Sequence, residues 1–112
     1  MKYLLTIEAR TRSSRLPGKV LKPILGKPML ARMIERLKYA RTVDGIVVAT
    51  TVNPDDDPIV NLAEESDVGV FRGSEEDVLA RVLGAARQYG ADVIVETTGD
   101  CPLIDPAIVD KV

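Results

Sequence analysis

Histidine is absent from this chain of 112 residues, and cysteine occurs only once. Without histidine, the chain cannot form a Ser-His-Asp or Cys-His catalytic group, and a zinc site is disfavoured. The single Cys101 permits no internal disulfide, which fits a reducing compartment. We therefore expect a cytoplasmic protein whose chemistry depends on other side chains.

Aromatic residues and long apolar segments are also scarce. Aromatic residues make up 4% of the chain, so the stacking platforms that single-stranded nucleic acid requires are nearly missing. The opening apolar run ends at Glu8 and is too short for a signal-peptide core or a membrane span. The sequence predicts a protein that binds neither nucleic acid nor a membrane.

The charges that are present are unevenly distributed. Residues 1–41 contain 11 Lys and Arg against 2 Asp and Glu, a balance of +9, whereas residues 42–112 contain 4 against 15, a balance of −11. A cationic first part suggests that this part binds an anionic ligand. The alternative is that the charges only solvate surfaces and pair with one another.

Short apolar runs alternate with helical patterns along the whole chain. Nearly continuous β-branched runs such as Ile46–Ala49 are typical of strands covered on both faces. This order predicts an α/β fold, a Rossmann-like and mainly parallel sheet with helices on both faces, in which residues 1–112 form a single nucleotide-binding domain. The expected strands are Tyr3–Ala9, Ile46–Thr51, Val68–Phe71 and Asp92–Thr97, and the expected helices are Pro28–Tyr39, residues 57–65, a helix after Asp77 that ends at Gly90, and one that opens at Asp105.

The helix after Asp77 is expected to bury one apolar face. Ser74 and Asp77 resemble the two ends of a capping box, and Gly90 is a suitable stop. The face predicted to be apolar contains Val78, Leu79, Val82, Leu83 and Ala86.

The connection between the first strand and the first helix, residues 10–27, is much longer than the usual loop of about 2–6 residues. It begins at the carboxyl end of a strand, where open α/β sheets bind their ligands. Arginine and lysine are suited to phosphate oxygens, serine hydroxyls add donors, and a glycine permits a tight turn. We therefore predict a polyphosphate site formed by Arg10, Ser13, Ser14, Arg15, Gly18 and Lys19.

Carboxylates at the ends of other predicted strands are candidates for a metal site. Asp100 follows the fourth strand and is suited to Mg²⁺, which takes carboxylate and phosphate oxygens, although it could instead cap a turn. In the run Asp55–Asp57 we expect Asp57 to cap a helix and the other two to be solvated turn residues. Ser74 is predicted to be a helix cap, and Cys101 a small packing residue.

These motifs, taken in order, resemble the cytidylyltransferase family. The run from Ala9 to Lys19 (ARTRSSRLPGK) matches that family's first motif, and 26–28 (GKP), 48–50 (VAT) and 99–105 (GDCPLID) follow in the family's order. The branch of the spore coat polysaccharide biosynthesis protein F is the most similar, because 71–79 (FRGSEEDVL) also matches it. The resemblance implies a nucleotide-diphospho-sugar transferase type of fold and transfer of CMP from CTP to a sugar acid or related sugar.

The resemblance also implies roles for individual residues. Arg10, Ser13, Arg15 and Lys19 would bind the triphosphate, Ala9 and Thr98 would lie near the cytosine, and Asp100 would bind Mg²⁺. Glu8 and Glu96 depart from the family pattern, and either would oppose a triphosphate if it pointed into the site. Family members are longer, so we expect this chain to correspond to their N-terminal half, with a homodimer as the full-length form.

Two other functions remain open. The first is another nucleotidyltransferase, or a nucleotide-sugar glycosyltransferase of the same fold. The second is a non-catalytic binding or assembly module that retains the fold but does not catalyse.

Overall fold

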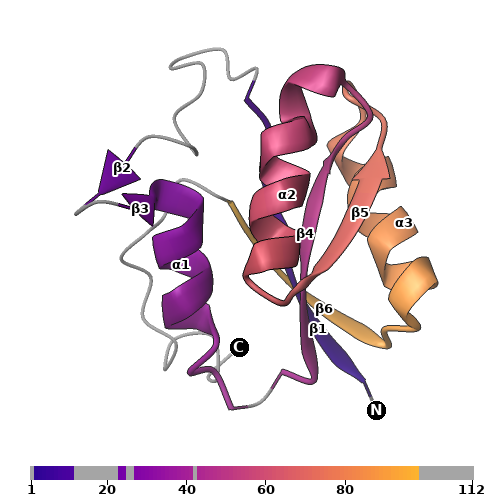
Figure 1. Ribbon diagram of the computed structural model, residues 1–112. Coiled ribbons are helices and arrows are strands. Elements are labelled where there is room, and N and C mark those ends of the chain that lie inside the picture. Colours follow the sequence, from indigo (N-terminus) through magenta and orange to yellow (C-terminus); the bar gives the residue numbers. More distant parts are fainter. Residues whose placement is uncertain (1, 12–22, 25–26, 42, 99–112) are drawn as a thin grey trace.

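Four parallel strands form the centre of the protein, which is described by a computed structural model over residues 2–11, 23–24, 27–41 and 43–98. They are β1 (Tyr3–Glu8), β4 (Gly45–Thr51), β5 (Gly69–Gly73) and β6 (Val93–Thr98), in the order β5-β4-β1-β6 (Figure 1). Every pairing between them is parallel. The predicted parallel α/β sheet is confirmed, and its strand bounds agree with the predicted ones to within two residues.

Three helices connect these strands. They are α1 (Met29–Leu37), α2 (Asp57–Glu65), which follows the short 3₁₀ helix η2 (Pro54–Asp56), and α3 (Val78–Tyr89). A small antiparallel pair, β2 (Pro23–Ile24) with β3 (Lys27–Pro28), lies in the connection for which the sequence predicted only a long loop. The helix predicted to open at Asp105 lies outside the described residues.

Helices α1 and α2 cover one face of the sheet, and α3 covers the other (Figure 1). On the first face, Leu5 and Ile7 of β1 contact Met33 and Ile34 of α1 and Ile59 of α2, all of them buried. This is the larger apolar cluster, and the helical spacing of α1 predicted it. Alternate residues of β1 point the other way, because successive side chains of a strand lie on opposite faces.

The second face differs from the prediction. Leu79 is 66% exposed and Leu83 is 43% exposed, so they do not belong to the buried face of α3. The buried residues are Arg81, Val82 and Ala85. Small residues at 84 and 85 bring the helix close to the sheet, because a Cβ at Gly84 would lie 2.3 Å from the ring of Phe71. The helix is therefore rotated so that its small residues, and not its largest apolar ones, face β5.

The ends of α3 are set by local hydrogen bonds. Asp77 is the N-cap, and its Oδ1 accepts from the backbone N–H of Ala80 at 3.0 Å. The prediction that Ser74 caps the helix is wrong: Ser74 lies three residues before the N-cap, and its Oγ accepts from the N–H of Asp77 at 3.2 Å. Gly90 ends the helix in the left-handed region at φ 66°, as predicted. None of the helices in the described ranges has the length and apolar character needed to cross a bilayer.

Candidate functional site

The carboxyl edge of the sheet contains a topological switch point. The chain leaves β1 for β4 on one side and later adds β6 on the other side of β1. Ligands of open α/β sheets bind outside the strand ends at such a point. Glu8 at the end of β1 is paired with Thr98 at the end of β6, so the segments that the sequence singled out leave the sheet at neighbouring places.

Ala9 and Arg10, two of the predicted site residues, extend directly from β1. The N–H of Ala9 donates to the carbonyl of Ala49 at 3.1 Å, and its side chain is buried. Arg10 is half-buried, and its Nη1 donates to the carbonyl of Glu75 at 3.4 Å. The Arg10 guanidinium carries five N–H donors, and this long bond is its one hydrogen bond within the described part of the chain.

The structure describes the other predicted site residues only in part. Thr98 is described through its backbone, which pairs with Glu8. The remaining predicted site residues lie outside the described residues: Ser13, Ser14, Arg15, Gly18, Lys19 and Asp100. For these positions the polyphosphate and magnesium assignments stay predictions.

The negative charge of Glu8 at this edge is compensated by an ion pair with Arg81. Its Oε1 accepts from Nη2 of Arg81 in α3 at 2.5 Å, with Arg81 fully buried. Nη1 of Arg81 also donates to the carbonyls of Ser74, at 2.7 Å, and Glu75, at 3.0 Å. The carboxylate is therefore on the α3 face of the sheet, where a buried cation neutralises it. The sequence could not decide this orientation.

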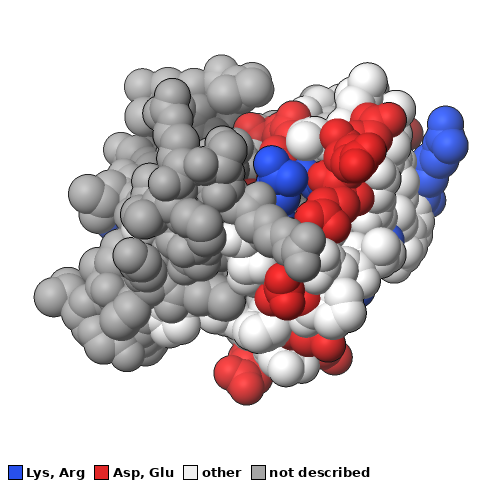
Figure 2. Space-filling view, turned by 90° about the horizontal axis from the view of Figure 1, so that it is seen from above, with Lys and Arg blue, Asp and Glu red and all other residues white. Residues whose placement is uncertain are grey.

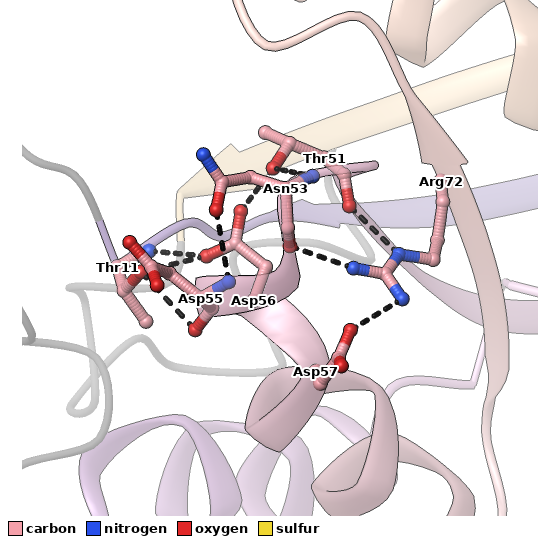
Figure 3. Close-up of polar contacts among 7 residues, drawn as sticks. All are labelled: Thr11, Thr51, Asn53, Asp55, Asp56, Asp57 and Arg72. Atoms are coloured by element: carbon pink, nitrogen blue, oxygen red, sulfur yellow. Dashed lines mark hydrogen bonds and ion pairs between the residues drawn. The ribbon is translucent and has the colours of Figure 1, made fainter.

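The loop after β4 contains a cluster of polar contacts that the sequence did not predict (Figure 3). Oδ1 of Asp56 accepts from the N–H of Thr11 at 2.7 Å and from the Thr11 hydroxyl at 2.9 Å. Oδ2 of the same carboxylate accepts from the hydroxyl of Thr51. Thr11 directly follows Arg10. This carboxylate therefore connects the β4 loop to the start of residues 10–19, the cation-rich segment that the sequence predicts to bind phosphates.

Arg72 stabilises the same loop from the neighbouring strand β5. Its Nε donates to the carbonyl of Thr51 at 2.7 Å, its Nη2 donates to that of Asn53 at 2.8 Å, and its Nη1 contacts Oδ1 of Asp57 at 2.8 Å (Figure 3). One guanidinium thus binds three successive parts of a short segment. The planar arrangement of its donors suits such multiple contacts.

The predictions for Asp56 and Asp57 were wrong. Asp56 is 1% exposed and is not a solvated turn residue. Asp57 gives α2 no side-chain cap, because the N-cap position is Asp56 and the Asp57 carboxylate pairs with Arg72. The run of three acidic residues at a strand end was a signal in the sequence that hydrogen-bond donors or cations lie nearby. The sequence could not show that these are Thr11 and Arg72, because only the fold brings them close.

The loops after β4 and β5 are also joined to each other. Nδ2 of Asn53 donates to Oε2 of Glu75 at 3.1 Å, and the carbonyl of Glu75 accepts from both Arg10 and Arg81. These contacts connect three strand ends across the carboxyl edge. They join the loops after β4 and β5 to the side chain of Arg10.

The described part of this edge is acidic. Figure 2 shows the molecule from above, with acidic side chains gathered around a cationic one. The acidic residues of these loops are Asp55, Asp56, Asp57, Glu75, Glu76 and Asp77. Their charge opposes an anionic ligand over β4 and β5 and favours the switch point between β1 and β6. Within the described ranges, no three Asp, Glu, Cys or His residues are grouped as metal ligands.

Comparison with known proteins identifies what this arrangement is similar to. The sequence model of the cytidylyltransferase family matches residues 4–112. A cytidylyltransferase structure from Leptospira borgpetersenii is 45% identical with a TM-score of 0.95, over 99% of this chain and 47% of that one. The CMP:2-keto-3-deoxy-manno-octonic acid synthetase, solved in complex with CTP, is 30% identical with a TM-score of 0.83, over 99% of this chain and 45% of that one.

A relative from Bacillus subtilis represents the branch that the sequence motifs singled out. It is the spore coat polysaccharide biosynthesis protein SpsF, which is 37% identical over 96% of this chain and 46% of its own length. The chain thus spans about half the length of the relatives it matches.

Proposed function

Because the chain belongs to the cytidylyltransferase family, we propose that it forms the nucleotide-binding part of an enzyme that transfers CMP from CTP to a sugar acid or related sugar. The observation that carries this proposal is the family match over residues 4–112, with Arg10 at the end of β1 beside the end of β6. In the proposed reaction the oxygen of a sugar hydroxyl forms a bond to the α-phosphorus of CTP and gives up its proton to water. The bond from that phosphorus to the oxygen that bridges the α- and β-phosphates breaks, and this oxygen leaves as part of pyrophosphate.

The cation-rich segment supplies the binding energy for the triphosphate. Arg10, Arg15 and Lys19 neutralise the phosphate oxygens, and Ser13 adds a hydroxyl donor. Such transfers need in-line positioning and neutralisation of charge more than a covalent nucleophile, so the absence of histidine is no obstacle. Mg²⁺, with Asp100 as its protein carboxylate, would add a Lewis acid at the phosphates when bound.

The nucleoside is bound at the neighbouring strand end. Ala9 is small and buried at the edge of the first core face, so the chain can approach a base closely there. Thr98 ends the strand on the other side of the switch point. The proposal therefore places cytosine between the ends of β1 and β6, with the phosphates directed toward the segment that begins at Arg10.

Calorimetric titration with the four nucleoside triphosphates in the presence of Mg²⁺ tests this proposal. We expect CTP to bind at least about tenfold more tightly than ATP, GTP or UTP, a difference of about 1.4 kcal/mol. Arg15→Ala should weaken CTP binding by about tenfold or more, since a guanidinium bonded to phosphate is lost. Arg87→Ala is the matched control, because Arg87 is exposed in the last turn of α3, at the opposite edge of the sheet. Equal affinity for all four nucleotides would overturn the assignment to CTP.

A further inference from the structure

Asp56, at the carboxyl edge of the sheet, is a buried carboxylate with 1% exposure. Within the described residues it has three donors: the N–H and the hydroxyl of Thr11 and the hydroxyl of Thr51 (Figure 3). A buried carboxylate is tolerated only where hydrogen bonds replace its lost hydration. The three bonds explain how the charge is tolerated. Two of them come from Thr11, and this partner indicates the role of Asp56.

Capping of its own helix does not account for the position of this carboxylate. Asp56 is the N-cap of α2, yet its side chain accepts no N–H from that helix. A capping aspartate would accept from the second or third residue of the helix. The Asp56 side chain is instead turned toward Thr11, which is 45 residues away along the chain.

Thr11 follows Arg10 directly and therefore lies at the start of the cation-rich segment. Two bonds, one to its backbone N–H and one to its side chain, fix both the position and the direction of the chain at this point. The residues proposed to bind the triphosphate begin at Arg10 and continue to Lys19. The Asp56 carboxylate therefore acts at the origin of that segment.

The loop that contains Asp56 is held in place by contacts with strand β5. Arg72 of β5 binds the carbonyls of Thr51 and Asn53, on the strand side of Asp56. It also pairs with Asp57, the next residue along the chain. The position of the carboxylate is consequently determined by β4 and β5, which are part of the sheet and do not depend on a ligand.

We propose that Asp56 is a positioning residue of the nucleotide site, which fixes Thr11 and so orders the start of the phosphate-binding segment before CTP arrives. This inference rests on the proposed function and adds a residue to it that does not touch the nucleotide. A segment whose first residues are already fixed loses less conformational freedom when it binds, so its affinity for the triphosphate is higher. The gain in affinity comes from the contacts to the phosphates, and the contacts to the base are unchanged.

The test compares Asp56→Asn with wild type in the full chain. The amide substitution keeps the size of the side chain but removes its charge and one acceptor oxygen, so the two Thr11 bonds, which share Oδ1, lose their charged acceptor and weaken. We expect the Kd for CTP to rise about tenfold, as expected when a buried group loses a partner. The Kd for CMP, which has a single phosphate, should change less than about threefold if the effect is exerted through the phosphate-binding segment. A purely structural role would weaken both nucleotides equally, and that result would overturn the proposal.

Two further variants keep the test decisive. Thr11→Val removes the hydroxyl bond but keeps the backbone N–H bond and the branched shape, so it should fold even if Asp56→Asn does not. We expect it to weaken CTP binding about threefold, with no further loss in an Asp56→Asn background because the two share one interaction. Glu64→Gln is the matched control, since it makes the same acid-to-amide change at an exposed position of α2, and it should change the Kd for CTP less than twofold.

Amide hydrogen exchange at Thr11 separates this proposal from the proposed function. In wild type without nucleotide we expect the Thr11 N–H to exchange at least about tenfold more slowly than in Asp56→Asn. If wild type does not bind CTP, the proposed function fails, and the exchange rate alone then decides whether Asp56 orders Thr11. Equal exchange rates in the two proteins would overturn the positioning role, even if CTP binds.

Discussion

At the scale of single residues, buried charges determine the geometry of the candidate site. Asp56 is 1% exposed and Arg81 is 0% exposed. Each is matched by partners from a distant part of the chain, Asp56 by Thr11 and Arg81 by Glu8. Removing one member of such a pair leaves the other without compensation, which destabilises more than the pair stabilises.

The Glu8–Arg81 pair leads to a prediction about stability. We expect Arg81→Met to lower the free energy of unfolding by about 3 kcal/mol, because Glu8 would keep its charge without a partner. Urea denaturation at neutral pH measures this change. Arg87→Met, an exposed position on the same helix, is the control and should change it by less than about 0.5 kcal/mol.

The double variant Glu8→Leu, Arg81→Met distinguishes the ion pair from simple packing. Among the described residues, Nε of Arg81 has no hydrogen-bond partner, so the guanidinium is not fully satisfied. We expect the double variant to recover at least about 1 kcal/mol relative to Arg81→Met, because apolar residues often replace a buried pair without loss. No recovery would mean that the volume of Arg81, and not its charge, is what matters.

At the scale of elements, α3 shows how packing against a sheet overrides apolar patterning. The sequence predicted Leu79 and Leu83 on the buried face, and both are exposed. Gly84 lies against Phe71 and leaves no space for a side chain between the helix and β5. The position of α3 matters for the site, because it brings Arg81 to the carbonyl of Glu75, which also accepts a hydrogen bond from Arg10.

Gly84→Ala tests this close approach. By helix propensity alone the substitution would stabilise α3 by about 1 kcal/mol. The Cβ would lie 2.3 Å from Phe71 Cζ, so we expect the steric conflict to prevail. The net result should be a loss of about 2 kcal/mol in the free energy of unfolding, measured by thermal or urea denaturation.

Phe71→Leu provides the matched background for this prediction. A smaller side chain at 71 removes the ring atoms that the new Cβ would meet. Gly84→Ala should therefore destabilise the Phe71→Leu protein by at least about 1 kcal/mol less than it destabilises wild type. If the two effects simply add, Phe71 is not the source of the conflict.

At the scale of the whole molecule, the distribution of charge is the dominant feature. Residues 1–41 carry +9 and the remainder −11, so the net charge of −2 conceals a strong separation. The described part of the carboxyl edge is acidic over β4 and β5 (Figure 2). In the proposed function this separation would guide the triphosphate toward the segment after β1, by attraction from one side and repulsion from the other.

This charge separation predicts that CTP binding depends on salt. Raising NaCl from about 50 mM to about 500 mM should weaken CTP binding about tenfold, because the Debye length shortens from about 14 Å to about 4 Å. CMP, with fewer negative charges, should show a clearly smaller change. Calorimetry at constant pH measures both, and a CTP affinity that does not change with salt would contradict binding by the cation-rich segment.

Much of the fold could be predicted from the sequence because its signals are local. Continuous β-branched runs identified the strands, proline and helical spacing identified α1 and α2, and Gly90 identified the end of α3. The family resemblance rested on local motifs in the same way, and the match over residues 4–112 confirms it. These features depend on residues that are close together along the chain, so one sequence is enough to detect them.

The tertiary structure decided what depends on contacts between distant residues. The sequence left the direction of Glu8 open, and the fold directs it to Arg81. It assigned Asp56 to solvent, and the fold buries it against Thr11. The sequence alone thus determined which elements form and which family they represent. The partners of the charged side chains at the strand ends follow from the strand order β5-β4-β1-β6, because that order brings segments more than forty residues apart to one edge.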